Sequence, residues 1–211
     1  EAFDVKVDPD PARNEVDITY ILSEKSSDQI QLQGGWGAGR IIGQLSLTFT
    51  NFSTRNILNL DKWSPLPAGD GQTLVLAASA TGMGYQNYQI NFMEPWLGGK
   101  KPTSLNVSLS RVIWASGETS STKITGVSLG LGKRLKIPDD YFLYRNSINF
   151  RQYELTNSQS FFSFTDGVSN NFNFSATLSR NSVDQPVFPR KGSHFDVSLK
   201  VTPPYSLFDG I

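Results

Sequence analysis

An alternation of apolar and polar side chains with a period of two is the feature that most constrains this chain. Residues 29–36 place isoleucine, leucine and tryptophan on one side and glutamines on the other. After a glycine-rich turn, the same alternation resumes from Gln44 to Thr50. Successive side chains of a β-strand point to opposite faces, so this stretch predicts a β-hairpin with one apolar face and one uncharged polar face.

The same pattern continues downstream and predicts about nine strands from residue 28 onward. Each strand is near the roughly 9–11 residues that cross a bilayer at a tilt. Small uncharged residues fill the second face, as is typical of a surface that meets a water-filled lumen. We expect the apolar face to meet lipid, as represented by Leu45, Leu47, Phe49, Leu105, Val107 and Leu109. Downstream of the opening hairpin the expected strands cover residues 73–81, 85–93, 104–114, 122–132, 141–155, 170–180 and 194–202.

A soluble β-sandwich would alternate in the same way, so the alternation alone does not separate the two classes. Strand length, even repetition and aromatic residues near strand ends favour an all-β transmembrane antiparallel barrel, because aromatics gather at membrane interfaces. The aromatic residues expected in such a girdle are Trp36, Phe52, Tyr85, Trp96, Trp114, Tyr141 and Tyr153.

Residues 1–25 differ in chemistry from the rest. Two charged, alternating segments around residues 3–7 and 16–22 flank a turn at Asp8 to Pro11, which predicts a water-exposed hairpin. A two-stranded hairpin is marginally stable alone, so we expect it to be the end of a soluble domain that begins earlier than this sequence.

No arrangement of residues predicts an enzyme. The sole histidine, His194, begins an expected strand beside Ser193 and near Asp196, and it has no second candidate metal ligand. The stretch Gly130 to Arg134 lacks the spacing of a phosphate-binding loop. Cysteine is absent, and the 19 Lys and Arg balance the 19 Asp and Glu, so neither a thiolate metal site nor nucleic-acid binding is expected.

The basic residues of the expected turns are distributed unevenly. We define the near side as the side from which the first barrel strand rises. Turns on the near side would then carry most of the cations, and far-side turns would carry little besides Arg40. Solvated turns tolerate lysine anywhere, so the pattern has a neutral explanation as well. The near-side cations are Arg55, Lys62, Lys100, Lys101, Lys133, Arg134, Lys136, Arg190 and Lys191.

Two turns look specific. One ends a strand with Glu94, Pro95 and Trp96, and the other precedes the last strand with Phe188, Pro189 and Gly192. Proline cannot donate to a strand ladder and so marks a strand end. With these two turns in this order and the short hairpin before them, the sequence resembles the BamA/Sam/Toc-type family. Members of this family are β-barrel assembly factors in the outer membrane of Gram-negative bacteria.

The resemblance implies a domain division and a function. Residues 1–25 would be the closing strands of a periplasmic POTRA domain, and residues 26–211 the N-terminal part of a barrel of about 16 strands. The function implied is insertion of β-barrel proteins into the outer membrane. Unfolded outer-membrane proteins would be the clients, accessory lipoproteins and membrane lipid the partners, with no cofactor, metal, nucleotide or nucleic acid. The alternatives are a passive porin-like channel and a soluble carbohydrate-binding β-protein.

The first barrel strand is the candidate functional element, because a weak seam beside it would open sideways as a lateral gate and expose an edge to a client strand. Its glycines lower strand stability, although they could also serve only the tight turn that follows. The candidate residues are Gln29, Ile30, Gln31, Leu32, Gln33, Gly34, Gly35 and Trp36.

Two further expectations concern completeness and one long turn. Nine strands do not close in the usual even-numbered way, so we expect the sequence to be part of a longer barrel that supplies the seam-closing last strand. The turn at residues 53–72 is long and is expected to hold a short helix or a partner contact.

Overall fold

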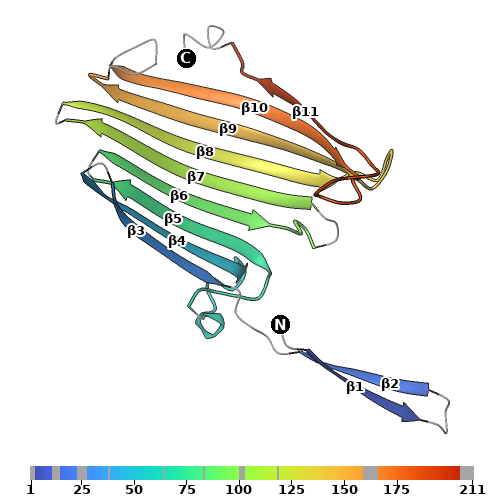
Figure 1. The fold of residues 1–211 in the computed structure, drawn as a ribbon. Coiled ribbons are helices and arrows are strands. Elements are labelled where there is room, and N and C mark those ends of the chain that lie inside the picture. Colours follow the sequence, from blue (N-terminus) through green and yellow to red (C-terminus); the bar gives the residue numbers. More distant parts are fainter. Residues whose placement is uncertain are drawn as a thin grey trace.

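The computed structural model describes residues 3–10, 15–22, 28–37, 39–63, 65–82, 84–99, 103–117, 119–158 and 166–204. These residues form a two-stranded and a nine-stranded antiparallel sheet (Figure 1). The small sheet pairs β1 (Phe3–Asp10) with β2 (Glu15–Leu22). The large sheet contains β3 (Gln29–Gly37), β4 (Arg40–Phe52), β5 (Gln72–Thr81), β6 (Tyr85–Glu94), β7 (Thr103–Ser116), β8 (Ser120–Arg134), β9 (Phe142–Thr156), β10 (Gly167–Asn181) and β11 (His194–Val201).

Each strand of the large sheet pairs with the next one along the chain, in the order β3 to β11. The expected nine strands and their antiparallel arrangement are therefore confirmed. The strands β7, β8 and β10 are longer than expected, with 14 or 15 residues each, and β9 has its expected length. Their ladders continue through short uncharged residues, such as Ser116 opposite Ser120, which pair as readily as the apolar residues do.

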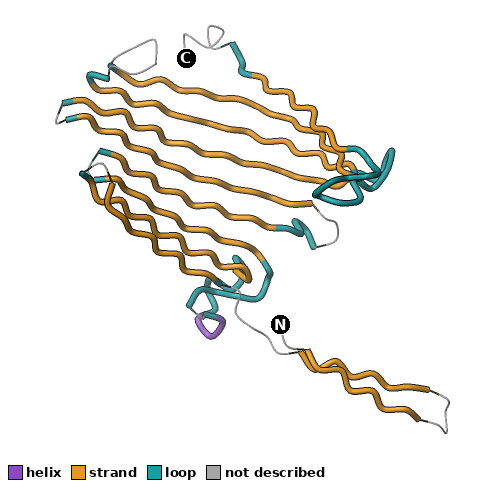
Figure 2. The backbone as a smooth tube through the Cα atoms, viewed as in Figure 1, coloured by secondary structure: helices purple, strands orange, loops and turns teal. Residues whose placement is uncertain are grey.

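One helical turn and one strand end complete the description. The short 3-10 helix η1 (Leu60–Lys62) lies in the long turn between β4 and β5, as expected (Figure 2). In the parts of the chain described above, no helix is long and apolar enough to span a membrane. The expected turn at Asp8 is wrong, because β1 continues to Asp10, where it pairs with Glu15.

The register of the large sheet separates two chemically distinct faces. One face carries rows of apolar side chains that lie opposite one another across all the strands from β4 to β11, and the neighbouring rows on the other face are polar. An apolar row contains Phe49, Leu74, Phe92, Val107, Leu129, Ile148, Phe174 and Val201. The adjacent row is polar except for Val75 and contains Thr48, Val75, Asn91, Ser108, Ser128, Asn149 and Asn173. The predicted alternation is thus confirmed.

The apolar face is not covered by any other part of the described chain. Leu109, Val127 and Leu129 are 42%, 43% and 46% exposed. Within the described ranges, Leu155 is the only large aliphatic side chain that is buried. Exposed apolar surface of this extent is unfavourable in water, so the sheet is suited to an apolar surrounding medium.

Hydrogen bonds between uncharged side chains organise the polar face. The Asn149 side chain accepts from the Ser128 hydroxyl at 2.6 Å and donates to Asn173 at 3.1 Å. Ser147 and Ser175 are joined across β9 and β10 at 2.7 Å. These contacts satisfy polar atoms without charge, as expected for the wall of a hydrated lumen.

The expected aromatic girdle is only partly correct. Phe52 packs edge-to-face on Phe92 of the apolar face, with ring centroids 6.3 Å apart. The rings of Tyr85 and Trp114 contact each other, with centroids 6.0 Å apart. Their strand register, like that of Tyr153, places them on the polar face. All three residues lie near strand ends, but their odd or even position in the strand decides the face.

The turn between β10 and β11 has a backbone that only glycine fits. Gly192 has a φ of +98°, and a Cβ added there would lie 2.1 Å from the Ser182 carbonyl oxygen. Gly167 has a similar φ of +115°, but a Cβ there would have no heavy atom within 4 Å. Substituting each glycine in turn therefore separates the effect of a clash with backbone atoms from the effect of a positive φ alone.

We predict different costs for lysine on the two faces of β7. Val107→Lys should destabilise the membrane-embedded protein by roughly 2–4 kcal/mol, because it moves a charge into lipid, whereas Ser108→Lys should cost far less. Reversible urea unfolding from lipid vesicles would measure both. Equal costs at the two neighbouring positions would contradict the assignment of the faces.

We also predict that Gly192→Ala is more damaging than Gly167→Ala. The alanine at position 167 should cost about 1–3 kcal/mol for its backbone conformation alone, and the one at 192 should cost more because it also meets backbone atoms. The same unfolding measurement compares the two variants. Indistinguishable stabilities would show that the turn at Gly192 relaxes freely.

Candidate functional site

The strand β3 lies at one edge of the large sheet and pairs with β4 through nine residue pairs, from Gln29 opposite Thr48 to Gly37 opposite Arg40. Among the described residues, no strand pairs with its other side. All eight candidate residues thus lie together on this one strand. Its unpaired side presents backbone N–H and C=O groups that can pair with another strand.

Two adjacent glycines, Gly34 and Gly35, interrupt the side-chain packing of β3 before the β3–β4 turn. Gly34 lies opposite Gly43, and Gly35 lies opposite Ile42. A Cβ added to Gly34, Gly35 or Gly43 would have no heavy atom within 4 Å. Cross-strand side-chain contacts are a main source of sheet stability, so the ladder is weakened at these two positions, although Trp36 lies opposite Ile41 just before the turn.

The beginning of β3 is held more firmly. The Asp28 carboxylate accepts a hydrogen bond from the Thr50 backbone N–H at 3.0 Å. Two apolar pairs, Ile30 with Leu47 and Leu32 with Leu45, follow on the apolar face. Asp28 was missed in the sequence, where it belongs to a polar connector and carries no motif. The strand is therefore anchored at its start and weakly packed towards its turn.

The Glu94 turn joins three parts of the sheet. The Glu94 carboxylate accepts from the side-chain amide of Gln72 at 2.7 Å and from the Trp96 N–H at 2.8 Å. The buried Gln72 side chain also accepts from the Thr54 N–H. Pro95 follows the last residue of β6, as predicted, and Trp96 is exposed. Glu94 is thus a structural residue that fixes the near-side ends of β5 and β6.

The Gly192 turn is fixed by a carboxylate as well. Asp184 accepts the backbone N–H groups of Arg190 at 2.9 Å and Lys191 at 3.1 Å, and these hydrogen bonds lower the pKa of Asp184. Phe188 has a φ of +60° and is 85% exposed. Pro189 follows Phe188 in an irregular segment outside the strands. The two motif turns are therefore both ordered by acidic side chains that bind backbone donors.

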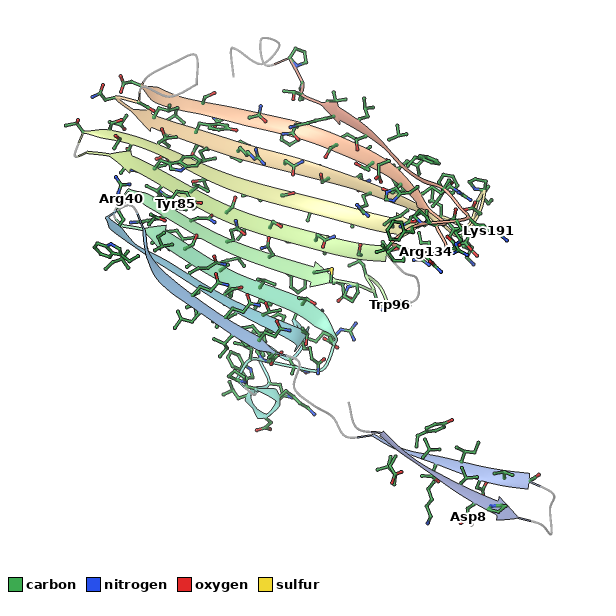
Figure 3. All side chains as sticks on the ribbon, in the orientation of Figure 1. Asp8, Arg40, Tyr85, Trp96, Arg134 and Lys191 are labelled. Carbon is green, nitrogen blue, oxygen red and sulfur yellow. The ribbon has the colours of Figure 1, made fainter. Side chains whose placement is uncertain are left out.

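An ion pair connects the start of the Gly192 turn with the turn between β8 and β9. Arg180, near the end of β10, donates to Asp139 at 2.8 Å and lies 5.7 Å above the rings of Tyr141 and Phe142. The hydrogen bond from Arg180 lowers the pKa of the Asp139 carboxyl. The basic turns lie together at one end of the sheet, where Figure 3 shows Arg134 and Lys191 opposite the end with Arg40 and Tyr85. Lys100 and Lys101 lie outside the described residues.

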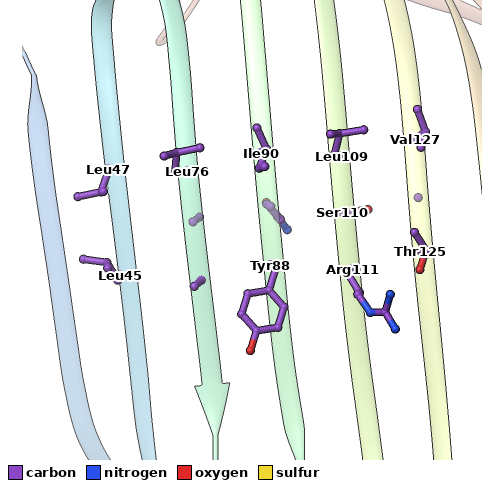
Figure 4. A pocket seen from close by; sticks show the side chains of 14 residues that line it. Leu45, Leu47, Leu76, Tyr88, Ile90, Leu109, Ser110, Arg111, Thr125 and Val127 are labelled. Carbon is purple, nitrogen blue, oxygen red and sulfur yellow. The ribbon is translucent and has the colours of Figure 1, made fainter. Parts of the chain in front are cut away.

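A shallow hollow lies on the apolar face close to β3. It has a volume of about 500 Å³, and Leu45, Leu76, Ile90 and Leu109 contribute to its walls (Figure 4). Its lining is almost entirely apolar and brings together no nucleophile and base. In the described ranges, no group of three acidic or histidine side chains could hold a metal ion. His194 contacts Asp196 at 3.0 Å on the same face of β11. The arrangement suits the pairing of another strand along β3 and contact with apolar groups at the hollow.

Comparison with known proteins agrees with this geometry. A structural match is the crystal structure of BamA from Haemophilus ducreyi lacking POTRA domains 1–3, with a TM-score of 0.58 and 19% sequence identity. The match covers 97% of this chain and 39% of that chain, and at this identity it shows the fold. The expected BamA-type barrel fold is therefore confirmed. A search of curated protein sequences finds no match.

The family assignment comes from the sequence itself. Residues 68–208 match the Omp85 superfamily domain, which is more than half of the chain. The match includes both motif turns and all the strands from β5 to β11. The chain belongs to the Omp85 superfamily.

Proposed function

We propose that this protein inserts β-barrel proteins into the bacterial outer membrane and that β3 is the strand at which clients pair. The observation that carries the proposal is the edge of β3, which is unpaired among the described residues and is weakly packed where Gly34 faces Gly43. An incoming strand and the barrel's own last strand would compete for the same backbone groups. Opening requires little side-chain rearrangement, because few side chains pack there.

The proposed clients are unfolded outer-membrane proteins, and the proposed partners are accessory lipoproteins and outer-membrane lipid. Client recognition would rest on main-chain hydrogen bonds, which any β-strand can form, so one edge can serve many sequences. The hollow near β3 would accept apolar client side chains or lipid tails during pairing.

We propose that β1 and β2 are the closing strands of a periplasmic POTRA domain. Their faces carry charged and β-branched residues, and among the described residues they contact no strand of the large sheet. Because β2 leads through a short connection into β3, the near-side turns would then face the periplasm.

A passive porin-like channel is the competing function. The polar face, with its uncharged serine and asparagine network, would suit the wall of a pore. A pore does not require a weakly packed first strand or a soluble hairpin before it. The two functions therefore differ over whether β3 must be free to move.

A disulfide lock separates the two functions directly. The sequence contains no cysteine, so an introduced pair can be crosslinked without interference. One cysteine in residues 29–35, crosslinked to the last strand of the complete barrel, should stop client insertion while the barrel stays folded, and reduction should restore activity. A control lock between Asn91→Cys and Ser108→Cys, which face each other across β6 and β7, should have no effect. If the lock at β3 left insertion at its normal rate, the channel would become the better account.

Proline in β3 should affect function at alternate positions. Neighbouring residues of a strand donate their N–H groups to opposite sides, so one of Leu32→Pro and Gln33→Pro removes a donor on the free side and the other a donor to β4. The variant that loses the free-side donor should impair client assembly with normal barrel stability. Ile30→Val, which keeps the backbone intact, should be nearly silent in the same assembly assay. Loss of stability in both proline variants without a specific assembly defect would argue against the pairing role.

The proposed orientation can be tested with an impermeant thiol reagent on intact cells. Cysteines at Arg134 and Lys191 should resist labelling because they would face the periplasm, whereas Thr119→Cys, at the opposite end of the sheet between β7 and β8, should be labelled. Labelling of all three after membrane permeabilisation is the control. The reverse pattern on intact cells would invert the orientation.

A further inference from the structure

The turn between β4 and β5 presents apolar side chains outward. Ile57, Leu58, Leu60 and Trp63 are 45%, 95%, 76% and 41% exposed. We call these four residues the apolar tip. Leu60 begins the short helix η1 and the other three lie on either side of it; Leu58 and Leu60 are largely uncovered, and Ile57 and Trp63 are partly covered.

The interior of the same turn is polar and well ordered. Ser53, which is fully buried, donates to the Asp70 carboxylate at 2.6 Å and accepts the Asn56 N–H at 3.1 Å. The Asn56 side chain donates to the Ala68 carbonyl at 2.9 Å. Backbone hydrogen bonds from Ser53 to Pro67 and from Ala68 to Lys62 close the turn. These contacts hold the tip in place.

This arrangement is the reverse of a water-soluble loop. In water, turning four large apolar side chains inward would stabilise a loop. Here the fully buried side chains are Ser53 and Pro67, and the part-buried Asn56 and Asp70 hydrogen-bond beside them. A polar interior that is hydrogen-bonded within itself, together with an apolar exterior, suits a segment that enters an apolar medium.

The position of the turn indicates which medium that is. The turn starts directly after Phe52, whose ring packs on Phe92 in an apolar row of the sheet. The apolar surface of the sheet thus continues to the base of the turn. The side chains of Arg55 and Lys62 are exposed beside the tip, and a tryptophan with aliphatic and basic neighbours is typical of segments at the level of lipid headgroups.

We propose that the apolar tip inserts into the interfacial region of the phospholipid leaflet at the near side of the sheet. The tip would lie beside the membrane-crossing ends of β4 and β5, and the stem around Ser53 would hold it at a fixed depth. Because β4 is the only described partner of β3, this contact would also hold the base of the β3–β4 hairpin at the membrane surface. The proposal depends on the membrane location of the sheet and not on insertase activity.

Spin labels can test the proposal in the complete protein reconstituted in vesicles of phosphatidylethanolamine and phosphatidylglycerol without clients. A nitroxide on Leu58→Cys should collide with oxygen, which concentrates in lipid, and be shielded from a water-soluble nickel chelate. Its oxygen-to-nickel collision ratio should be several-fold higher than that of Lys136→Cys, in an exposed near-side turn, and lower than that of Val107→Cys in the middle of the apolar face.

Two other outcomes are possible, and either would overturn the proposal. A ratio equal to that of Lys136→Cys would place the tip in water, and protection from both oxygen and nickel would mean that protein covers it. Leu60→Cys provides a second label in the tip, and the mobility of the unheated barrel in gel electrophoresis shows that each variant is folded. Because no client is present, failure here leaves the insertase proposal untouched, and failure of the disulfide lock leaves this one untouched.

Discussion

The need to satisfy every backbone hydrogen-bonding group in lipid governs this structure. An unpaired N–H or C=O in hydrocarbon costs several kcal/mol, so a sheet that crosses a membrane must pair each strand on both sides. The strands from β4 to β9 have a partner on each side, and β10 has a second partner, β11, from Phe174 to Asn181. The edge strands β3 and β11 meet it on one side only among the described residues, and we propose that the free side of β3 is where a change of partner takes place.

The distribution of side-chain contacts decides how easily that change occurs. The interior strands combine their ladders with apolar rows and with hydrogen bonds such as that between Ser128 and Asn149. At β3 the ladder is accompanied by two aliphatic pairs and by the Asp28 contact at its start. Towards the turn, Gly34 and Gly35 interrupt the side-chain pairs, and only Trp36, opposite Ile41, follows them. The turns at the near side are rigid, by contrast, because Glu94 and Asp184 bind backbone donors there. A mobile edge on a rigid frame is the arrangement that the proposed insertion of clients requires.

Most of the fold could be predicted from the sequence because the period of two reports directly on the faces of a sheet. The nine strands, the two faces and the grouping of the candidate residues on β3 follow from this pattern. Long-range contacts between polar side chains, such as Gln72 with Glu94, leave no periodic signal and were not predictable. Tyr85 and Trp114 were assigned to an interfacial girdle by their place at strand ends, although their register puts them on the polar face. The exposure of apolar side chains on the turn between β4 and β5 could not be predicted, because no sequence pattern indicates which side chains of a turn are buried.

The central claim is that β3 is held more weakly than the interior strands of the sheet. Hydrogen–deuterium exchange of backbone amides in the membrane-embedded complete protein tests this claim most directly. The account predicts that amides of β3 exchange several-fold faster than those of β7, with the largest difference near Gly34 and Gly35, where side-chain packing is absent. Equal protection of β3 and β7 would show a firmly closed seam and would contradict the account.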